Sequence, residues 1–454
     1  MTETAQEKNA IITGTIWKQL LLFFFPLLGG TFFQILYNTV DAIVVGRFVG
    51  KEALSAVGGS TGILISLFVG LFVGISAGSS VVVAQFVGAG RREEVHRAVH
   101  TSMALALIGG VVLNVTLLLF SETMLRAMGT PEDIAGLSLL YMRIYACGML
   151  GNMIYNFGAS ILRGAGNSKA PFCFLVAGAL ANIILDLVTV MIFHMGVWGV
   201  ALATILSQYV SAAATLFYMI RSKEIYRLEL RRIRVEREYF IRIFRIGVPA
   251  ALRSLMYSFS NVLIQRCING FGTDTVAAWT VWERIDAIYW MIINSLGIAV
   301  TTFIGQNYGA GRYDRVRRCV REGMVISAGF TFFMIAVFLT QKEPFLHLFT
   351  GDPAVMEIGR EVIEFMAPML IAYISIEILS SSLQGMGAVV IPTIITIGGV
   401  CLLRIVWIYT VVPRWQGLHT ILYSYPFSWL VSSAAFWIYY EYFVRKKRIY
   451  SARG

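Results

Sequence analysis

Long apolar segments recur along the whole chain and are separated by short polar stretches. About 20 apolar residues are enough for a helix to cross a bilayer. Several segments are longer than that, which favours tilted, kinked or extended helices. The pattern predicts twelve transmembrane helices, with approximate spans 17–46, 54–88, 98–120, 138–162, 171–194, 198–220, 241–269, 276–308, 320–340, 357–386, 390–412 and 418–444.

Composition agrees with this pattern. Hydrophobic residues make up 57% of the chain and charged residues only 14%, whereas about a quarter of a soluble domain is charged. The alternating segments of a membrane β-barrel are absent from the sequence. We therefore expect an all-α polytopic protein in contact with the lipid bilayer. Its net charge of +11 then reflects basic cytoplasmic loops, not a nucleic-acid partner.

The basic residues predict the orientation. The N-terminus, every second loop and the C-terminus together carry 26 Lys and Arg residues, and the opposite loops carry 5. Because Lys and Arg accumulate in cytoplasmic loops, both termini are predicted to be cytoplasmic. An even number of helices agrees. The expected location is a lipid membrane that the chain crosses several times.

The chain repeats itself. QFVGAGRREEVHRAV at 85–99 and QNYGAGRYDRVRRCV at 306–320 share eight of fifteen residues at an offset of 221. LRGAGNSKAP at 162–171 resembles LQGMGAVVIP at 383–392 at the same offset. Six helices per repeat return the chain to the same side, so the two repeats are predicted to be parallel. The predicted domains are an N-terminal lobe at 1–220, a charged cytoplasmic linker at 221–240 and a C-terminal lobe at 241–454.

Motifs of enzymes and ATP-driven pumps are missing from the sequence. It contains no GxxxxGK[ST], HExxH or GxSxG pattern, and the five cysteines form no CxxC pair. We expect no catalytic residue, no enzyme activity and no cofactor.

Carboxylates inside the predicted helices of the first half are the main chemical signal. Asp41 lies in LYNTVDAIVV and Asp186 in LANIILDLVTV. A charged side chain at the bilayer centre costs about 2.5–3.5 kcal/mol on insertion scales, so such groups face the protein interior. Tyr37 shares a helix face with Asp41, and Asn182 with Asp186, while Thr204 is a third contributor. The alternative is helix–helix hydrogen bonding without a role in transport.

The second half offers acids beside aromatic residues. Glu283 and Asp286 lie in WERIDAIYW, and Glu377 lies in YISIEILSS. Acids with aromatic faces suit an organic cation, although Trp and Tyr also anchor helices at the membrane interface. The candidate substrate-binding residues are Tyr37, Asn38, Glu283, Asp286, Trp282 and Glu377.

These motifs together, with GVWGVALATILSQ after the fifth segment, resemble the multidrug and toxic compound extrusion family over nearly the whole chain. The resemblance implies a V-shaped pair of six-helix lobes. It also implies a secondary antiporter, expected to be monomeric, that exports organic cations or drugs in exchange for H⁺ or Na⁺. Asp41, Asn182, Asp186 and Thr204 match the family's cation-coupling cluster. Asp41 and Asp186 would be the metal ligands if Na⁺ is the coupling ion.

Two other functions stay open at this point. A lipid-linked saccharide flippase of the same superfamily would use basic residues near the pyrophosphate, and Arg253, Arg266 and Arg404 lie in or near helices. A membrane-embedded enzyme or sensor would need a nucleophile or metal cluster. The twelve helices and the acid cluster of the first half favour the antiporter.

The orientation can be tested by labelling. A cysteine introduced in the segment 221–245 should be shielded from an impermeant thiol reagent added to intact cells, because this segment is predicted to be cytoplasmic. Labelling of that cysteine from outside would overturn the orientation.

Overall fold

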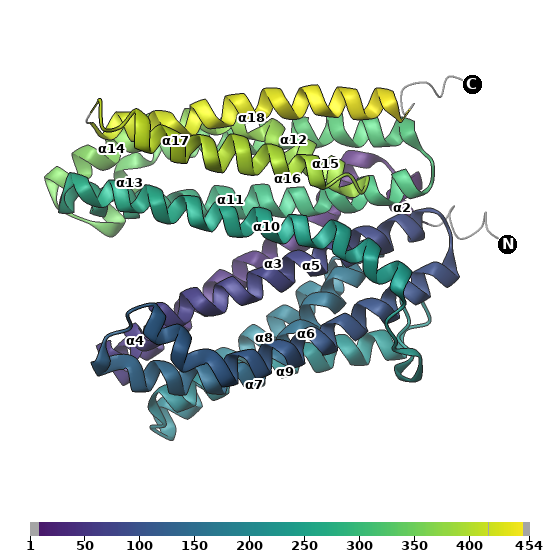
Figure 1. Cartoon of the computed structure of the whole chain (residues 1–454), viewed down its shortest axis with the longest axis horizontal. Helices are drawn as coiled ribbons and strands as arrows, with labels where there is room; N and C mark the ends of the chain where they lie inside the picture. Colours follow the sequence, from purple (N-terminus) through teal and green to yellow (C-terminus); the bar gives the residue numbers. More distant parts are fainter. Residues whose placement is uncertain (1–8, 416, 448–454) are drawn as a thin grey trace. The chain divides into compact units, whose positions relative to one another are not determined.

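The computed structural model describes residues 9–415 and 417–447, and within these ranges the chain is helical with short turns and contains no strand (Figure 1). This is the expected outcome in a bilayer, because a membrane-spanning helix satisfies its backbone N–H and C=O groups internally. Ten helices are long and apolar enough to cross a membrane. The helices α10 and α18 are also long enough, with 32 and 29 residues. The predicted all-α polytopic fold is therefore confirmed.

Contacts between residues divide the chain into two compact units. One comprises Leu22–Ala251 and is called the N-unit here; the other comprises Met1–Leu21 with Leu252–Gly454 and is called the C-unit. The units follow the two sequence repeats except at their starts. The first residues of the helix α3 belong to the C-unit, and the first half of α10 belongs to the N-unit. The predicted boundaries at 220 and 240 remain a prediction about the repeats.

The N-unit is a bundle of long helices in which α7 contacts α4, α5, α6, α8 and α9 (Figure 1). The helices α3 and α8 end in the π-helical segments η1 and η2. In a π-helix the backbone hydrogen bonds join residues five apart instead of four. The bounds are α3 Ile16–Val44, η1 Val45–Val49, α4 Lys51–Gly58, α5 Ser60–Gly88, α6 Arg92–Ala127, α7 Glu132–Gly164, α8 Lys169–Asp186, η2 Leu187–Ile192 and α9 Gly196–Arg221.

The C-unit is built around α11, which contacts α12, α14 and α15. It also begins with the short helix α2 at Ala10–Thr13. The helix η3 at Leu230–Arg232 lies in the linker and belongs to the N-unit, and α10 at Arg237–Ile268 begins in the N-unit and ends in the C-unit. The other bounds of the C-unit are η4 Asn269–Phe271, α11 Thr273–Gly309, α12 Tyr313–Thr340, α13 Lys342–Phe349, α14 Pro353–Met369, η5 Leu370–Tyr373, α15 Ile374–Gly385, α16 Val390–Ile395, η6 Thr396–Leu402, α17 Leu403–Thr410 and α18 Leu418–Lys446.

The repeated sequence motifs form the same backbone turn in both repeats. Gly90 and Gly311, which are 221 residues apart, have φ angles of 69° and 70°. Gly166 and Gly387, at the same offset, have φ angles of 94° and 81°. Each glycine follows the end of a long helix, where a left-handed residue allows the last carbonyl groups to be capped. The GAGR loops are thus helix-ending turns, and only glycine adopts this conformation without strain.

The N-terminal segment docks on the end of α11 and the start of α12 in the C-unit. Asn9 donates a hydrogen bond to Gln306 Oε1 at 2.9 Å. The Nη2 of Arg315 donates to the carbonyl oxygens of Ile11 at 3.1 Å and Gly14 at 2.7 Å. Ile12 is fully buried beside them. A charged donor therefore satisfies carbonyl groups that the four-residue helix α2 leaves free.

The linker between the repeats docks on the N-unit in a similar way. The backbone N–H of Leu228 donates to Met219 O at 3.1 Å, and that of Glu229 donates to His100 Nε2 at 3.0 Å. The N–H of Glu236 donates to Thr101 Oγ1 at 3.3 Å. The linker is therefore held by specific backbone contacts along its length.

Arg315 tests how the N-terminal segment is held. Hydrogen bonds from charged donors contribute about 1.5–3 kcal/mol, so Arg315→Gln should speed amide hydrogen exchange at residues 9–14 by tenfold or more. Arg318→Gln removes the same charge from an exposed position on the same helix and should leave this exchange unchanged. Equal exchange in the two variants would show that Arg315 does not hold the segment.

Candidate ion-coupling and substrate sites

The two acids of the N-unit lie where regular helices change to π-helices. Asp41 is four residues before η1, and Asp186 directly precedes η2. The segments η1 and η2 contact each other, and both contact α9. Single π-helical turns inside membrane helices are frequent at functional sites. The segments η1 and η2 therefore lie at the same place as Asp41 and Asp186.

Polar atoms at this place have no hydrogen-bond partner among the described residues. Asp186 is fully buried and Asn182 is 1% exposed. Both carboxylate oxygens of Asp186, both amide atoms of Asn182 and Oδ1 of Asp41 are buried without a partner. A buried polar group without a partner costs about 1–3 kcal/mol, and a charged one costs more. A further proton or cation would satisfy the carboxylate oxygens at this place.

Two tyrosines complete the cluster. Tyr141 is close enough to interact with Asp41, Asp186 and Thr204, and Tyr145 is close enough to interact with Asp41. Their rings stack with centroids 5.9 Å apart. Sequence reasoning missed both residues, although their spacing of four within a membrane segment places them on one helix face.

The other predicted residues of the first half differ in position. Asp41 and Asp186 are close enough for their side chains to interact. Thr204 is half-buried, and its hydroxyl donates to Val200 O at 2.9 Å. Tyr37 is half-buried and lies near Asp41. Asn38 is exposed. The structure thus brings Asp41, Asp186 and Thr204 to one cluster around Tyr141, whereas within the described ranges it shows no contact between Asn38 and these residues.

The donor atoms of this cluster are carboxylate, amide, hydroxyl and phenol oxygens. Hard cations prefer such oxygen ligands, and a carboxylate pair also suits a proton. Among residues 9–415 and 417–447, no group of three or more His, Cys, Asp or Glu side chains lies together. The donor set at this place is therefore two carboxylates with neutral oxygen neighbours, a composition compatible with a proton or a hard cation.

In the C-unit, Asp286 lies in an aromatic cluster. The indole N–H of Trp290 donates to Asp286 Oδ2, and Asp286 Oδ1 is buried without a partner among the described residues. The ring of Trp290 lies edge-on to Tyr373, with centroids 4.7 Å apart. Glu283 is exposed. Acid and aromatic faces therefore do meet in the C-unit, with Asp286 as the enclosed acid.

Glu377 lies in a separate polar group of the C-unit. Ser381 donates to its Oε1 at 3.2 Å, and Arg253 is close enough for a charge interaction. The guanidinium of Arg253 donates to Ser380 Oγ and Gln384 Oε1. The structure therefore gives Glu377 a basic neighbour that the sequence did not reveal.

Trp282 is buried and packs against another aromatic side chain. It is 2% exposed and lies edge-on to Phe338, with ring centroids 5.9 Å apart. The predicted substrate-binding residues of the second half therefore occupy three settings: an exposed acid, two enclosed acids and a buried tryptophan.

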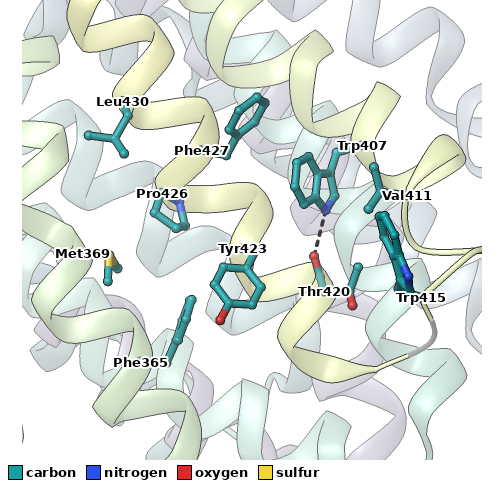
Figure 2. Close-up of a pocket in the computed structure, with 10 residues that line it drawn as sticks. All are labelled: Phe365, Met369, Trp407, Val411, Trp415, Thr420, Tyr423, Pro426, Phe427 and Leu430. Atoms are coloured by element: carbon teal, nitrogen blue, oxygen red, sulfur yellow. Dashed lines mark hydrogen bonds between the residues drawn. The ribbon is translucent and has the colours of Figure 1, made fainter.

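One cavity of about 530 Å³ opens among α14, α17 and α18 of the C-unit (Figure 2). Trp407 lines it and donates a hydrogen bond from its indole to Thr420 O at 2.8 Å. None of the predicted site residues lines it. The lining residues are Phe365, Met369, Trp407, Val411, Trp415, Thr420, Tyr423, Pro426, Phe427 and Leu430.

The fold is that of a polytopic helical membrane protein with buried acids in its first half. The MatE family model matches residues 26–188 and 249–410. The chain therefore belongs to the MatE family, the multidrug and toxic compound extrusion transporters, as its motifs indicated. Membership in this family shows that the chain is a multi-pass membrane transporter and not an enzyme.

Known proteins resemble the chain over nearly its whole length. A probable multidrug resistance protein of Bacillus subtilis (YoeA) is 29% identical, with 96% of each chain covered. A probable multidrug resistance protein of Thermotoga maritima (NorM) is 26% identical, covering 88% of this chain and 87% of that protein. A solved transporter of the MOP superfamily from Pyrococcus furiosus has a TM-score of 0.88 at 23% identity, with 98% of each chain covered. This last likeness supports the fold.

Gly297 tests the packing around Glu377. A Cβ atom at Gly297 would lie 2.0 Å from Glu377 Oε1. Gly297→Ala should therefore lower the thermal midpoint of the purified protein, because overpacking costs about 1–3 kcal/mol. Gly329→Ala, where a Cβ meets open space, should leave the midpoint unchanged or raise it.

A double variant makes this test specific to the carboxylate. Glu377→Ala should recover part of the loss in the Gly297→Ala background, because the clashing oxygen is gone. Strictly additive effects of the two substitutions would mean that Glu377 is not what Gly297 accommodates.

Proposed function

We propose that this transporter is a secondary active antiporter that exports organic cations or drugs in exchange for H⁺ or Na⁺ by alternating access. Asp41, Asn182, Asp186 and Thr204 form the coupling site. The single observation that supports this most is the set of buried oxygen atoms of Asp41, Asn182 and Asp186 without hydrogen-bond partners. The names of the relatives, multidrug resistance proteins, support an organic substrate.

The physical argument rests on the acid pair. Two neighbouring carboxylates in an apolar environment repel each other when both are ionised, and one H⁺ or Na⁺ relieves this repulsion. Ion binding therefore stabilises the arrangement in which the acids are close. Release of the ion stabilises an arrangement in which they separate. The energy comes from the ion gradient, since one charge moving inward gains about 2.3 kcal/mol per 100 mV.

The substrate side of the proposal uses the second half. Asp286, with Trp290 and Tyr373 beside it, provides negative charge and aromatic faces for an organic cation. Tyr37, Asn38, Glu283 and Glu377 are further candidates. We propose that the protein acts as a monomer in the bacterial inner membrane with both termini in the cytoplasm, in agreement with the bias of Lys and Arg.

Transport in liposomes tests the proposal. The purified protein is reconstituted, a Na⁺ gradient and a pH gradient are imposed separately, and movement of a fluorescent organic cation is followed. Wild type should transport with at least one gradient, which identifies the coupling ion. Asp41→Asn should abolish gradient-driven transport, because one carboxylate of the pair is lost. Asp186→Asn should abolish transport or shift its ion dependence.

A matched control separates coupling from general effects of charge. Glu52→Gln removes an acid from an exposed position on α4 and should transport at the wild-type rate. All variants should show the wild-type elution profile and thermal midpoint. If Asp41→Asn transports at the wild-type rate with the same ion dependence, Asp41 is structural and the coupling model is wrong.

A further inference from the structure

The C-unit encloses an arginine without an acidic partner. Arg404 lies in α17, two residues after the π-helix η6, and is 3% exposed. Its Nε donates to Ser428 Oγ at 2.9 Å. Its guanidinium carbon lies 4.1 Å from the ring centroid of Tyr425 and 5.5 Å from that of Trp429. Within the described ranges, no carboxylate lies within ion-pair distance of Arg404.

This environment stabilises the charge only in part. A cation removed from water costs several kcal/mol unless it is paired and hydrogen-bonded. Stacking of the guanidinium on an aromatic face stabilises the charge by about 0.5–2 kcal/mol per contact. The hydrogen-bond acceptor, Ser428, is neutral and does not balance the charge. The guanidinium has five N–H donors, of which one has an acceptor here. The others are free to bind an anion.

A second donor lies beside the first. Trp429 is 1% exposed, and its indole N–H has no acceptor among the described residues. Its ring packs against Tyr425, with centroids 5.6 Å apart, and against Tyr373 at 5.7 Å. The guanidinium of Arg404 and the indole N–H of Trp429 therefore lie in one aromatic cluster with N–H donors that lack acceptors. A ligand with oxygen atoms could accept hydrogen bonds from both.

The contrast with Arg253 shows that this is not general for the C-unit. Arg253 donates to Ser380 and Gln384 and lies close to the carboxylate of Glu377. Its charge is balanced within the protein. Arg404, in comparison, has the neutral hydroxyl of Ser428 as its hydrogen-bond acceptor and lies over aromatic rings.

The internal repeat shows which position of the first half corresponds to Arg404. The offset of 221 aligns Arg404 with Ile183, one residue after Asn182 and three before Asp186. The same region of the fold therefore carries acids in the first repeat and a base in the second.

We propose that Arg404, with Trp429, binds an oxyanion group of an organic substrate, either a carboxylate or a phosphate. The guanidinium would bind two oxygen atoms side by side, and the rings of Tyr425 and Trp429 would contact the apolar part of the ligand. This assignment of substrate chemistry rests on the proposed function, because the ligand is taken to be transported. Tyr425 is close to both Arg404 and Asp286, so one ligand can present an oxyanion and a cation together.

A pair of dyes tests the site by direct binding. A rhodamine with a free carboxylate and the methyl ester of the same dye differ only in the oxyanion. Their affinities for the purified full-length protein in lipid nanodiscs are measured by fluorescence anisotropy without any ion gradient. Wild type should bind the carboxylate dye about tenfold or more tightly than the ester, the strength of a hydrogen bond to a charged group.

Variants connect this preference to Arg404. Arg404→Gln should weaken binding of the carboxylate dye to the level of the ester and leave the ester unchanged. Arg404→Lys should keep part of the preference, because it keeps the charge. Arg414→Gln removes a basic residue from an exposed position and should keep the full preference.

A competition experiment shows whether the site accepts phosphates as well as carboxylates. An alkyl phosphate that displaces the carboxylate dye, when the alcohol of the same chain length does not, extends the site to phosphate-bearing lipids. No displacement by the alkyl phosphate restricts the site to carboxylates. Equal displacement by phosphate and alcohol would overturn the proposal, since the oxyanion would then contribute nothing.

Equal wild-type affinities for the two dyes would also overturn it. That comparison needs no variant, so it decides the question even if Arg404→Gln does not fold. It is independent of the liposome experiment as well. Transport without a dye preference removes only the oxyanion site, and a preference without gradient-driven transport removes only the antiport proposal.

Discussion

The cost of an unsatisfied polar group in an apolar solvent governs this molecule. Backbone groups avoid the cost by forming long helices, and most polar side chains avoid it by bonding to the turn before them, as Thr204 does with Val200. Some buried side-chain atoms in the described chain nevertheless lack a partner. Asp41 and Asp186 in the N-unit, with Asp286 and Trp429 in the C-unit, are among them. Where the fold leaves such groups unpaired, a ligand can supply what the protein does not.

One backbone plan carries two kinds of chemistry. Gly90 and Gly311 make the same left-handed turn at the same point of each repeat, and each repeat includes π-helical backbone, η1 and η2 in the first and η6 in the second. On this shared plan the N-unit gathers acids and tyrosines, whereas the C-unit gathers aromatic rings around Asp286 and Arg404. Turns and helix ends are fixed by local geometry, so they repeat. Side chains in the interior are free to diverge, because helix packing requires only that volume and polarity be compatible.

The compact units also differ from the sequence repeats for a physical reason. The repeat boundary is visible because identical motifs recur at a constant offset. Recurring motifs do not show which residues the N-terminal segment contacts. Arg315 holds the carbonyl groups of Ile11 and Gly14 from about 300 residues away in sequence, and His100 accepts from Glu229 across the linker. Such contacts depend on which surfaces meet, and hydropathy contains no information about that.

The sequence by itself determined the all-helical membrane fold, the internal repeat and the family, because span length and recurring motifs are properties of the chain alone. It also indicated Asp41, Asn182 and Asp186 as one candidate site, since each acid is costly in a bilayer and has a polar neighbour four residues away. Tertiary structure decided that Tyr141 and Tyr145 join these acids, that Trp282 packs on Phe338, and that Arg404 lies over Tyr425 and Trp429. Helical periodicity shows which residues share a face, but the opposing face is chosen by packing between helices far apart in the chain.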